Sequence, residues 1–139
     1  MNNPPPKPSG GVKVTLPWHN GGRIPREYTC DGANRAPHVK VSRTGPGGTA
    51  IVMTDPDAPG GTFVHWTRWG TTEGRNSFGN TGYDGPCPPR GDKPHHYVVT
   101  AYVLKSKLGL PEGASLDSVV AQIRVRASAS GSITGLYGR

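Results

Sequence analysis

Carboxylate, imidazole and phenol side chains gather in three clusters, each at the end of a segment typical of a β-strand, where strand-rich folds place their binding sites. A carboxylate raises the pKa of a neighbouring imidazole and keeps it protonated near neutral pH, and an imidazolium binds phosphate or carboxylate oxygens well. If the clusters meet in the fold, they form a site for a small anion. Their members are Asp55, Asp57, His65, Trp66, His95, His96 and Tyr97.

The first cluster lies in the turn DPDAPG of residues 55–60. Prolines before and after Asp57 fix the backbone, so we expect a turn that holds both carboxylates in place before a ligand binds. Asp57 could then receive an ammonium group, which would suit a zwitterionic head group. The alternative is that the two aspartates only brace the turn. A calcium loop is excluded, because Pro59 and Trp66 stand at positions that would have to supply ligands.

The second cluster is His65 with Trp66, on the next strand segment. The third cluster opens the long segment HHYVVTAYVL. Adjacent residues of a strand point to opposite faces, so His95 shares a face with Tyr97 while His96 points away. Only one of these histidines can therefore belong to a pocket that contains Tyr97. The proline-rich segment GPCPP of residues 85–89 would stiffen a loop at the rim and leave backbone groups free for a ligand.

The same side chains leave enzymatic alternatives open. Two histidines and one carboxylate can hold a metal ion, and an Asp with a His can act as the base in a hydrolysis. However, the sequence has no GxSxG, HExxH, P-loop or GxGxxG motif and no serine in an evident nucleophilic context. We expect a binding protein without a cofactor or metal rather than an enzyme, with an Asp/His or metal-dependent hydrolase as an alternative.

Composition narrows the fold and the partners. The 139 residues suit a single domain, and 21 Gly and 15 Pro with 32% hydrophobic residues favour short strands and turns over long helices. The net charge of +7 is scattered along the chain, which predicts a cationic surface rather than a specific nucleic-acid site. No apolar run is long enough to span a membrane, and the N-terminus lacks the apolar core of a secretory signal, so we expect a cytoplasmic protein without a transmembrane segment.

The two cysteines, Cys30 and Cys87, stand far apart and outside any CxxC spacing. Such spacing indicates neither a metal knuckle nor a disulfide framework. In a reducing compartment free thiols are the expected state, although one disulfide stays geometrically possible.

Five segments have the period or the composition of strands. Turn signals such as DGAN and TGPGGT separate them, as in a sandwich of two sheets, and the longest segment suits a central position in a sheet. We expect a mostly β fold, a two-sheet β-sandwich with one C-terminal helix. The strand segments are 12–16, 38–41, 49–54, 63–69 and 95–104.

One helix is predicted in the C-terminal third. Ser115 can cap it, Asp117 suits its first turn, and Leu116, Val119, Val120 and Ile123 fall on one face. Residues 127–137 fit a last strand or a loop equally well.

The first eleven residues, MNNPPPKPSGG, carry four prolines and no hydrophobic pair. Such a segment cannot form a core, so we expect residues 1–11 to be a flexible arm and residues 12–139 to be a single domain.

Three motifs together resemble the phosphatidylethanolamine-binding protein family, and most closely its bacterial and archaeal branch, which is often described as Raf kinase inhibitor-like. They are IPREYTCDGAN, TDPDAPGGTFVHW and GYDGPCPPRGDKPHHY, in this order. The resemblance runs from about Val12 to Arg139 and includes the terminal LYGR. It implies a two-sheet β-sandwich with a C-terminal helix and a surface pocket for anions such as phosphate or a phosphorylated head group.

The resemblance also implies which residues line that pocket. Two aspartates, a rim proline, the histidine of the aromatic-rich strand, the pocket loop and the His and Tyr of an HRY-like motif all have counterparts in this chain. One proline of DPDAP would follow a cis peptide bond. The implied ligand-binding residues are Asp55, Asp57, Pro59, His65, Gly85, Pro89, His95 and Tyr97.

Some positions depart from the family pattern. His96 replaces the common arginine of HRY, and the connection GTTEGRN is shorter and lacks the usual Ile-Pro, so the sheet edge there is expected to be reshaped. Cys30 and Cys87 lie in motifs that bring the chain toward the pocket side, which leaves a bridge between them open.

Members of this family bind lipid head groups, modulate kinase signalling or inhibit serine proteases, so the resemblance points to a site more than to a biological role. Our first expectation is a protein that binds a small anion or phosphorylated head group and modulates a protein partner such as a kinase. The alternative is a serine protease inhibitor that acts through an exposed loop.

Overall fold

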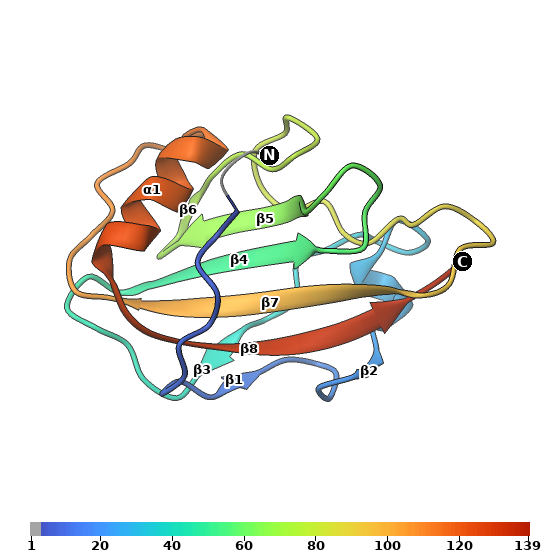
Figure 1. Ribbon diagram of the computed structural model, residues 1–139, viewed down its shortest axis with the longest axis horizontal. Coiled ribbons are helices and arrows are strands. Elements are labelled where there is room, and N and C mark those ends of the chain that lie inside the picture. Colours follow the sequence, from blue (N-terminus) through green and yellow to red (C-terminus); the bar gives the residue numbers. More distant parts are fainter. Residues whose placement is uncertain (1–3) are drawn as a thin grey trace.

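A central sheet of six strands organises the computed structural model, which describes residues 4–139 (Figure 1). The strand order is β2-β8-β7-β4-β5-β6, in which β2 and β8 are parallel and the other neighbours antiparallel. A second sheet pairs β1 with β3. The elements are β1 Val14–Thr15, β2 Gly22–Arg23, the 3-10 helix η1 Arg26–Tyr28, β3 Lys40–Val41, β4 Thr49–Asp55, β5 Phe63–Trp69, β6 Thr72–Glu73, β7 His95–Leu104, α1 Leu116–Arg126 and β8 Ala127–Tyr137.

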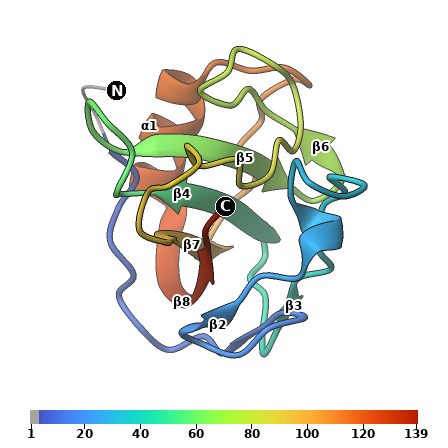
Figure 2. The same ribbon diagram turned by 90° about the vertical axis from the view of Figure 1, so that its right-hand side faces the viewer.

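The central sheet carries a packed core on each face. Helix α1 covers one face, and η1 lies with β1 and β3 on the other (Figure 2). On the α1 side, Val119 and Ile123 pack with Val52 and other side chains of the sheet. On the opposite side, Trp18 and Met53 belong to a separate apolar cluster. Because β4 and β7 are buried on both faces, they read as nearly continuous apolar runs.

The mostly β fold with two sheets and one C-terminal helix is confirmed. Ser115 caps α1 as predicted, since its hydroxyl accepts a hydrogen bond from the Ser118 N–H at 3.2 Å. The strands predicted over 49–54, 63–69 and 95–104 are present within one residue. The two N-terminal strands are shorter than predicted, because each pairs over only two residues.

Residues 127–137, which fit a strand or a loop, form strand β8 next to β7. Its small residues allow other segments to lie directly on it. A Cβ atom at Gly131 would collide with the backbone of Val12, and one at Gly135 would collide with the side chains of Ile24 and Trp18. Larger residues at these two positions are therefore excluded, which weakens the usual strand signal.

The expectation of free thiols was wrong, because Cys30 and Cys87 form a disulfide with their Cα atoms 5.4 Å apart. The Cys30 N–H also donates to the Pro86 carbonyl at 3.1 Å, so the segment after η1 lies against the loop of residues 85–89. The disulfide could not be predicted from the spacing of the two cysteines in the sequence, because it depends on how the segments around Cys30 and Cys87 fold onto the same end of the sheet.

The expected cis peptide bond was also wrong, because none occurs among residues 4–139. The turn after β4 is closed by other means. The Asp57 N–H donates to Asp55 Oδ1 at 2.8 Å, and Gly60 and Gly61 have φ angles of 84° and 115°. An Asx turn followed by two glycines with positive φ reverses the chain with trans bonds only.

The predicted arm of residues 1–11 includes residues 1–3, which lie outside the described residues. Residues 4–11 cross the face of the central sheet beside α1 (Figure 1). The Ser9 N–H donates to Ser130 Oγ at 2.6 Å, and the Tyr102 hydroxyl donates to the Pro6 carbonyl. These residues therefore pack without any hydrophobic pair of their own, while the predicted flexibility of the arm stays a prediction.

Candidate functional site

A cavity of about 160 Å³ lies where β4 ends and where β5 and β7 begin. Each strand supplies at least one polar side chain to it. All of these residues are buried, with exposed fractions of 4% for Asp55, 4% for His65, 6% for His95 and 1% for Tyr97. Pro59 and Pro89 lie in the wall, as the sequence predicted. Polar groups this deeply buried must be paired, and the pairs define the chemistry of the site.

The Asp55 carboxylate uses its two oxygens for two tasks. Oδ1 accepts the Asp57 N–H and closes the turn after β4, and Oδ2 pairs with His95 Nδ1 at 2.6 Å. Asp55 therefore does more than brace the turn, since it also positions a pocket histidine.

His95 lies between two carboxylates, with Asp55 on Nδ1 and Asp92 on Nε2 at 3.1 Å. Burial lowers the pKa of His95, but the hydrogen bonds and charges of Asp55 and Asp92 outweigh that effect and raise the pKa above its ordinary value. The site therefore favours an imidazolium at this position.

His65 differs from His95 in its protonation. Its Nδ1 lies 2.7 Å from the Asp84 carbonyl, which can only accept, so Nδ1 carries the proton. Burial lowers the pKa of His65, and the Asp84 carbonyl and the Asp55 charge offset this only in part. His65 is therefore a neutral imidazole whose Nε2 holds a lone pair.

Tyr97 packs against both histidines. Its ring centroid lies 5.4 Å from that of His65 in an edge-on contact and 6.3 Å from that of His95 in a stacked contact. Burial and the charges of Asp55 and Asp57 raise the pKa of Tyr97, which keeps its hydroxyl protonated. The predicted pairing of His95 with Tyr97 on one face is confirmed, and His96 points outward and is exposed.

Asp57 lies outside this cavity, in a neighbouring hollow that His95 and His96 also line. Its Oδ2 accepts hydrogen bonds from the backbone N–H and from the ring Nδ1 of His96, both at 2.7 Å. These bonds lower the pKa of Asp57. Its structural effect is to tie the turn after β4 to the start of β7.

Gly85, which the resemblance implied at the pocket loop, does not line the cavity, although its backbone hydrogen-bonds the pocket residue His65. Its N–H donates to Asn34 Oδ1 at 2.9 Å, and a Cβ atom at this position would collide with the Tyr28 carbonyl. The structure therefore requires a glycine here for close packing of the loop against the segment around η1.

Sequence reasoning missed Cys87 and two aromatic residues of the cavity, Phe63 and Phe78. Pro86, Pro88 and Pro89 have no N–H, so Cys87 carries the one N–H of residues 86–89, a signal that the sequence did contain. Phe78 is 51% exposed and contacts Phe63 edge-on with centroids 4.6 Å apart. Its loop position carries no pattern that would have placed it at the cavity.

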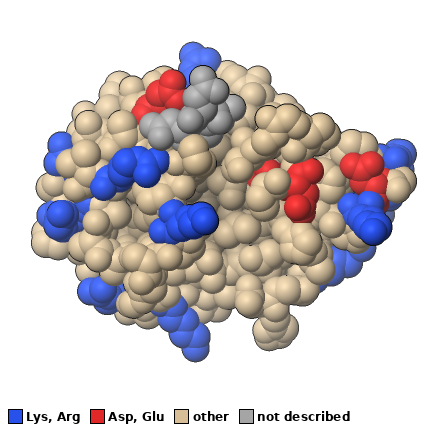
Figure 3. Space-filling view, viewed as in Figure 1, with Lys and Arg blue, Asp and Glu red and all other residues tan. Residues whose placement is uncertain are grey.

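Charge on the surface is dispersed. Figure 3 shows Lys and Arg side chains spread over one face of the molecule rather than gathered in a single block. Among residues 4–139, no three His, Cys, Asp or Glu side chains are arranged to hold a metal ion together.

Comparisons with known proteins agree on one family. The family model described as phosphatidylethanolamine-binding protein matches residues 15–138. A UPF0098 protein of Aquifex aeolicus is 39% identical, over 88% of this chain and 85% of its own. LppC of Mycobacterium tuberculosis, provisionally named a lipoprotein, is 38% identical, over 85% of this chain and 67% of its own. The crystal structure of E. coli YbcL, described as a new member of the mammalian PEBP family, superposes with a TM-score of 0.82 and 28% identity, covering 94% of this chain and 99% of that one.

Proposed function

The chain belongs to the phosphatidylethanolamine-binding protein family, and from this premise we propose that the cavity between β4, β5 and β7 binds a small phosphorylated or other anionic group. One observation carries the proposal: two histidines converge on a single cavity, His95 with carboxylates that raise its pKa and His65 with a pKa that burial lowers. We propose a binding protein rather than an enzyme, with no cofactor.

The size of the cavity limits the ligand. About 160 Å³ corresponds to roughly five water molecules at about 30 Å³ each. Sites for drug-sized molecules are larger, at about 300–1,000 Å³. A phosphate-sized group suits this volume, whereas the acyl chains of a lipid would stay outside.

The donors and acceptors of the cavity suit a phosphoryl group. Asp55 occupies His95 Nδ1, so a bound anion would take the place of Asp92 at Nε2. The Cys87 N–H can donate a further hydrogen bond, and His65 Nε2 can accept the proton of a phosphate monoanion. Two carboxylates, Asp55 and Asp92, against one imidazolium leave a net charge of −1 at this group, so a protonated or singly charged phosphate is favoured over a dianion. We propose that Asp57, which lines the neighbouring hollow, meets an ammonium such as that of phosphoethanolamine.

We further propose that ligand binding modulates a protein partner at the mouth of the cavity. The exposed aromatic ring of Phe78 stands at that mouth, where a ligand and a partner would both contact it. Exposed aromatic residues are enriched in protein interfaces.

Titration with inorganic phosphate and with phosphoethanolamine, followed by amide NMR, tests the anion site. We expect chemical-shift changes that saturate and cluster around Asp55, His65, Cys87 and Tyr97. The variants His65→Gln and His95→Gln should lose them, while His96→Gln, which changes an exposed neighbouring histidine, should keep them. Circular dichroism of each variant establishes that it is folded.

Shifts spread evenly over the basic surface, or equal in all three variants, would count against the anion site. A saturating response to phosphoethanolamine but not to phosphate would show instead that the ammonium contact near Asp57 dominates.

The cellular location stays a prediction. None of the helices among residues 4–139 has the length and apolar character needed to cross a membrane. The sequence led us to expect the cytoplasm, in which thiols are normally kept reduced. The Cys30–Cys87 disulfide and the lipoprotein name of one relative favour an oxidising compartment instead.

A further inference from the structure

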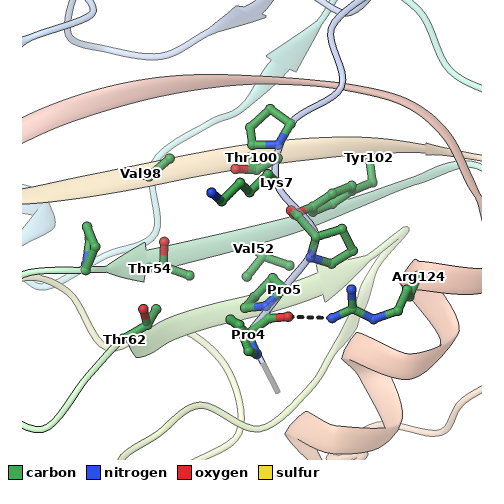
Figure 4. Close-up of a pocket in the computed structure, with 13 residues that line it drawn as sticks. Pro4, Pro5, Lys7, Val52, Thr54, Thr62, Val98, Thr100, Tyr102 and Arg124 are labelled. Carbon is green, nitrogen blue, oxygen red and sulfur yellow. Dashed lines mark hydrogen bonds between the residues drawn. The ribbon is translucent and has the colours of Figure 1, made fainter. Parts of the chain in front are cut away.

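A groove runs along the α1-side face of the central sheet, on the opposite side from the anion cavity. Its floor is formed by Val52, Thr54, Val98, Thr100 and Tyr102 of β4 and β7. The proline-rich arm of residues 4–8 lies across it, between α1 and the loop after β4 (Figure 4). We propose that this groove binds extended proline-rich segments of partner proteins, and that the arm of this chain occupies it in their absence.

The arm has the conformation that such recognition needs. Prolines fix φ near −65°, and a residue before proline is held in the extended region, so PPPKP is extended before it binds. An extended polyproline chain makes no internal hydrogen bonds and leaves its carbonyls available. Little conformational entropy is lost when it docks.

The groove supplies donors for those carbonyls. The Tyr102 hydroxyl donates to the Pro6 carbonyl, and Arg124 of α1 donates from Nη2 to the Pro4 carbonyl at 2.6 Å (Figure 4). Burial raises the pKa of Tyr102 to about 12, so its hydroxyl stays a donor. Grooves lined by aromatic residues recognise proline-rich segments in general. Here one aromatic residue, Tyr102, lies in the floor and also donates to a proline carbonyl.

The arm does not fill the groove. A space of about 580 Å³ remains beside it, toward Thr54, Thr62 and Val98 (Figure 4). That volume lies within the range of ligand sites, at about 300–1,000 Å³. The two hydrogen bonds to Pro4 and Pro6 use backbone carbonyls, which any proline-rich segment can offer. A longer or bulkier partner segment can therefore replace the arm.

A fluorescence anisotropy titration tests this proposal. The full chain is titrated into a labelled synthetic peptide with the sequence of residues 4–10, PPPKPSG. Three substitutions, Pro4→Gly, Pro5→Gly and Pro6→Gly, weaken the arm in place. We expect the arm-weakened protein to bind the peptide at least tenfold more tightly than the unchanged protein, because the competing segment is weakened. The control peptide GGGKPSG should bind at least tenfold more weakly.

Two further variants of the arm-weakened protein test the donors. Tyr102→Phe removes one hydroxyl, and Arg124→Gln removes an exposed guanidinium; each should weaken peptide binding about threefold to tenfold, as expected for one hydrogen bond. The matched control is Tyr83→Phe, which removes a hydroxyl that donates to the Tyr28 carbonyl in the other core. It should leave peptide binding unchanged.

The proposal is overturned if the arm-weakened protein is folded by circular dichroism and does not bind the peptide at millimolar concentration, or if it binds both peptides equally. A doubled mass of the unchanged protein on size-exclusion chromatography would assign the groove to the arm of a second copy and also overturn the proposal of a separate partner.

Discussion

The two faces of the central sheet carry sites of opposite character, although they share strands. On β4, Thr54 faces the groove and Asp55 faces the anion cavity; on β7, Val98 and Tyr97 divide in the same way. Alternation along a strand thus places the two sites back to back, one residue apart.

The cavity and the groove are held together by different forces. The cavity depends on buried, charged hydrogen bonds such as Asp55 to His95, which are costly to leave half-formed. The groove depends on apolar contact and on hydrogen bonds to backbone carbonyls of an extended segment, one from the Tyr102 hydroxyl and one from the exposed Arg124 guanidinium. The cavity should therefore resist opening but lose much of its stability when one hydrogen-bond partner is removed, whereas the groove should exchange its occupant at small cost in free energy.

The largest effect is expected from the disulfide, which supports the cavity wall at Cys87. For a bond that closes a loop of 57 residues, the chain-entropy model gives a stabilisation of about 4 kcal/mol. Reduction should lower the free energy of unfolding by about that amount and weaken phosphate binding. Urea unfolding with and without a phosphine reductant measures the first effect, and titration measures the second.

The double variant Cys30→Ser and Cys87→Ser serves as the control for reduction. It should match the reduced protein and show no response to the reductant. A reduced protein of unchanged stability and unchanged phosphate affinity would show that the loop of residues 85–89 is held without the bond.

The second effect concerns the buried pair at the cavity. Asp55→Asn should lower the free energy of unfolding by about 2 kcal/mol near pH 6, because a charged hydrogen bond is lost in a buried place. His95 has a raised pKa in the folded protein, so its contribution is complete below about pH 6.5 and is lost as the pH rises through the folded value. The difference between the two proteins in urea unfolding should therefore shrink between pH 6 and pH 9.

Asp57→Asn is the matched control, since this carboxylate binds the exposed His96. An exposed pair contributes about 0–1 kcal/mol, so the change should be smaller. Equal losses in the two variants would contradict the contrast between the buried and the exposed pair.

The third effect is the pH dependence of anion binding. Burial lowers the pKa of His65 in the free protein, and a bound anion would raise it, so binding takes up a proton. The affinity for sulfate, whose own charge is constant in this range, should rise by about tenfold from pH 8 to pH 6. Isothermal titration calorimetry at the two pH values measures it.

His65→Gln should remove the part of this pH dependence that comes from His65 and leave the part that comes from His95, whose pKa is raised, while His96→Gln should keep both parts. An undiminished pH dependence in His65→Gln would contradict the role given to the neutral histidine.

Local sequence patterns were enough to predict the parts of the fold that depend on neighbouring residues. The alternation of side chains along a strand correctly predicted that His95 shares a face with Tyr97 and that His96 points outward. Ser115, a residue typical of helix N-caps, correctly predicted the start of α1. These features depend on strand and helix geometry, which acts over a few residues.

Contacts between distant segments escaped the same reasoning. The disulfide, the packing of Gly85 behind the wall and the seating of the proline-rich arm each depend on segments that meet only in the folded chain. The arm was judged by its lack of hydrophobic pairs, although proline rings and backbone carbonyls can pack where a sheet offers apolar contacts and hydrogen-bond donors. The resemblance implied that Asp57 lines the cavity, but its hydrogen bonds to His96 hold it outside.

The smallest expected effect tests whether the two faces act independently. The loop between β4 and β5 touches both sites, since Pro56 and Thr62 line the groove while Ala58 and Pro59 line the cavity. Because Asp55 and Asp57 tie that loop to β7 by hydrogen bonds, weakening the arm with Pro4→Gly, Pro5→Gly and Pro6→Gly should change phosphate affinity by less than about twofold, well under 1 kcal/mol. The same titration in Asp57→Asn removes one tie and should increase the response to the arm. A large response with both ties intact would mean that the loop transmits occupancy of the groove to the cavity, and the two sites would then form one regulated unit.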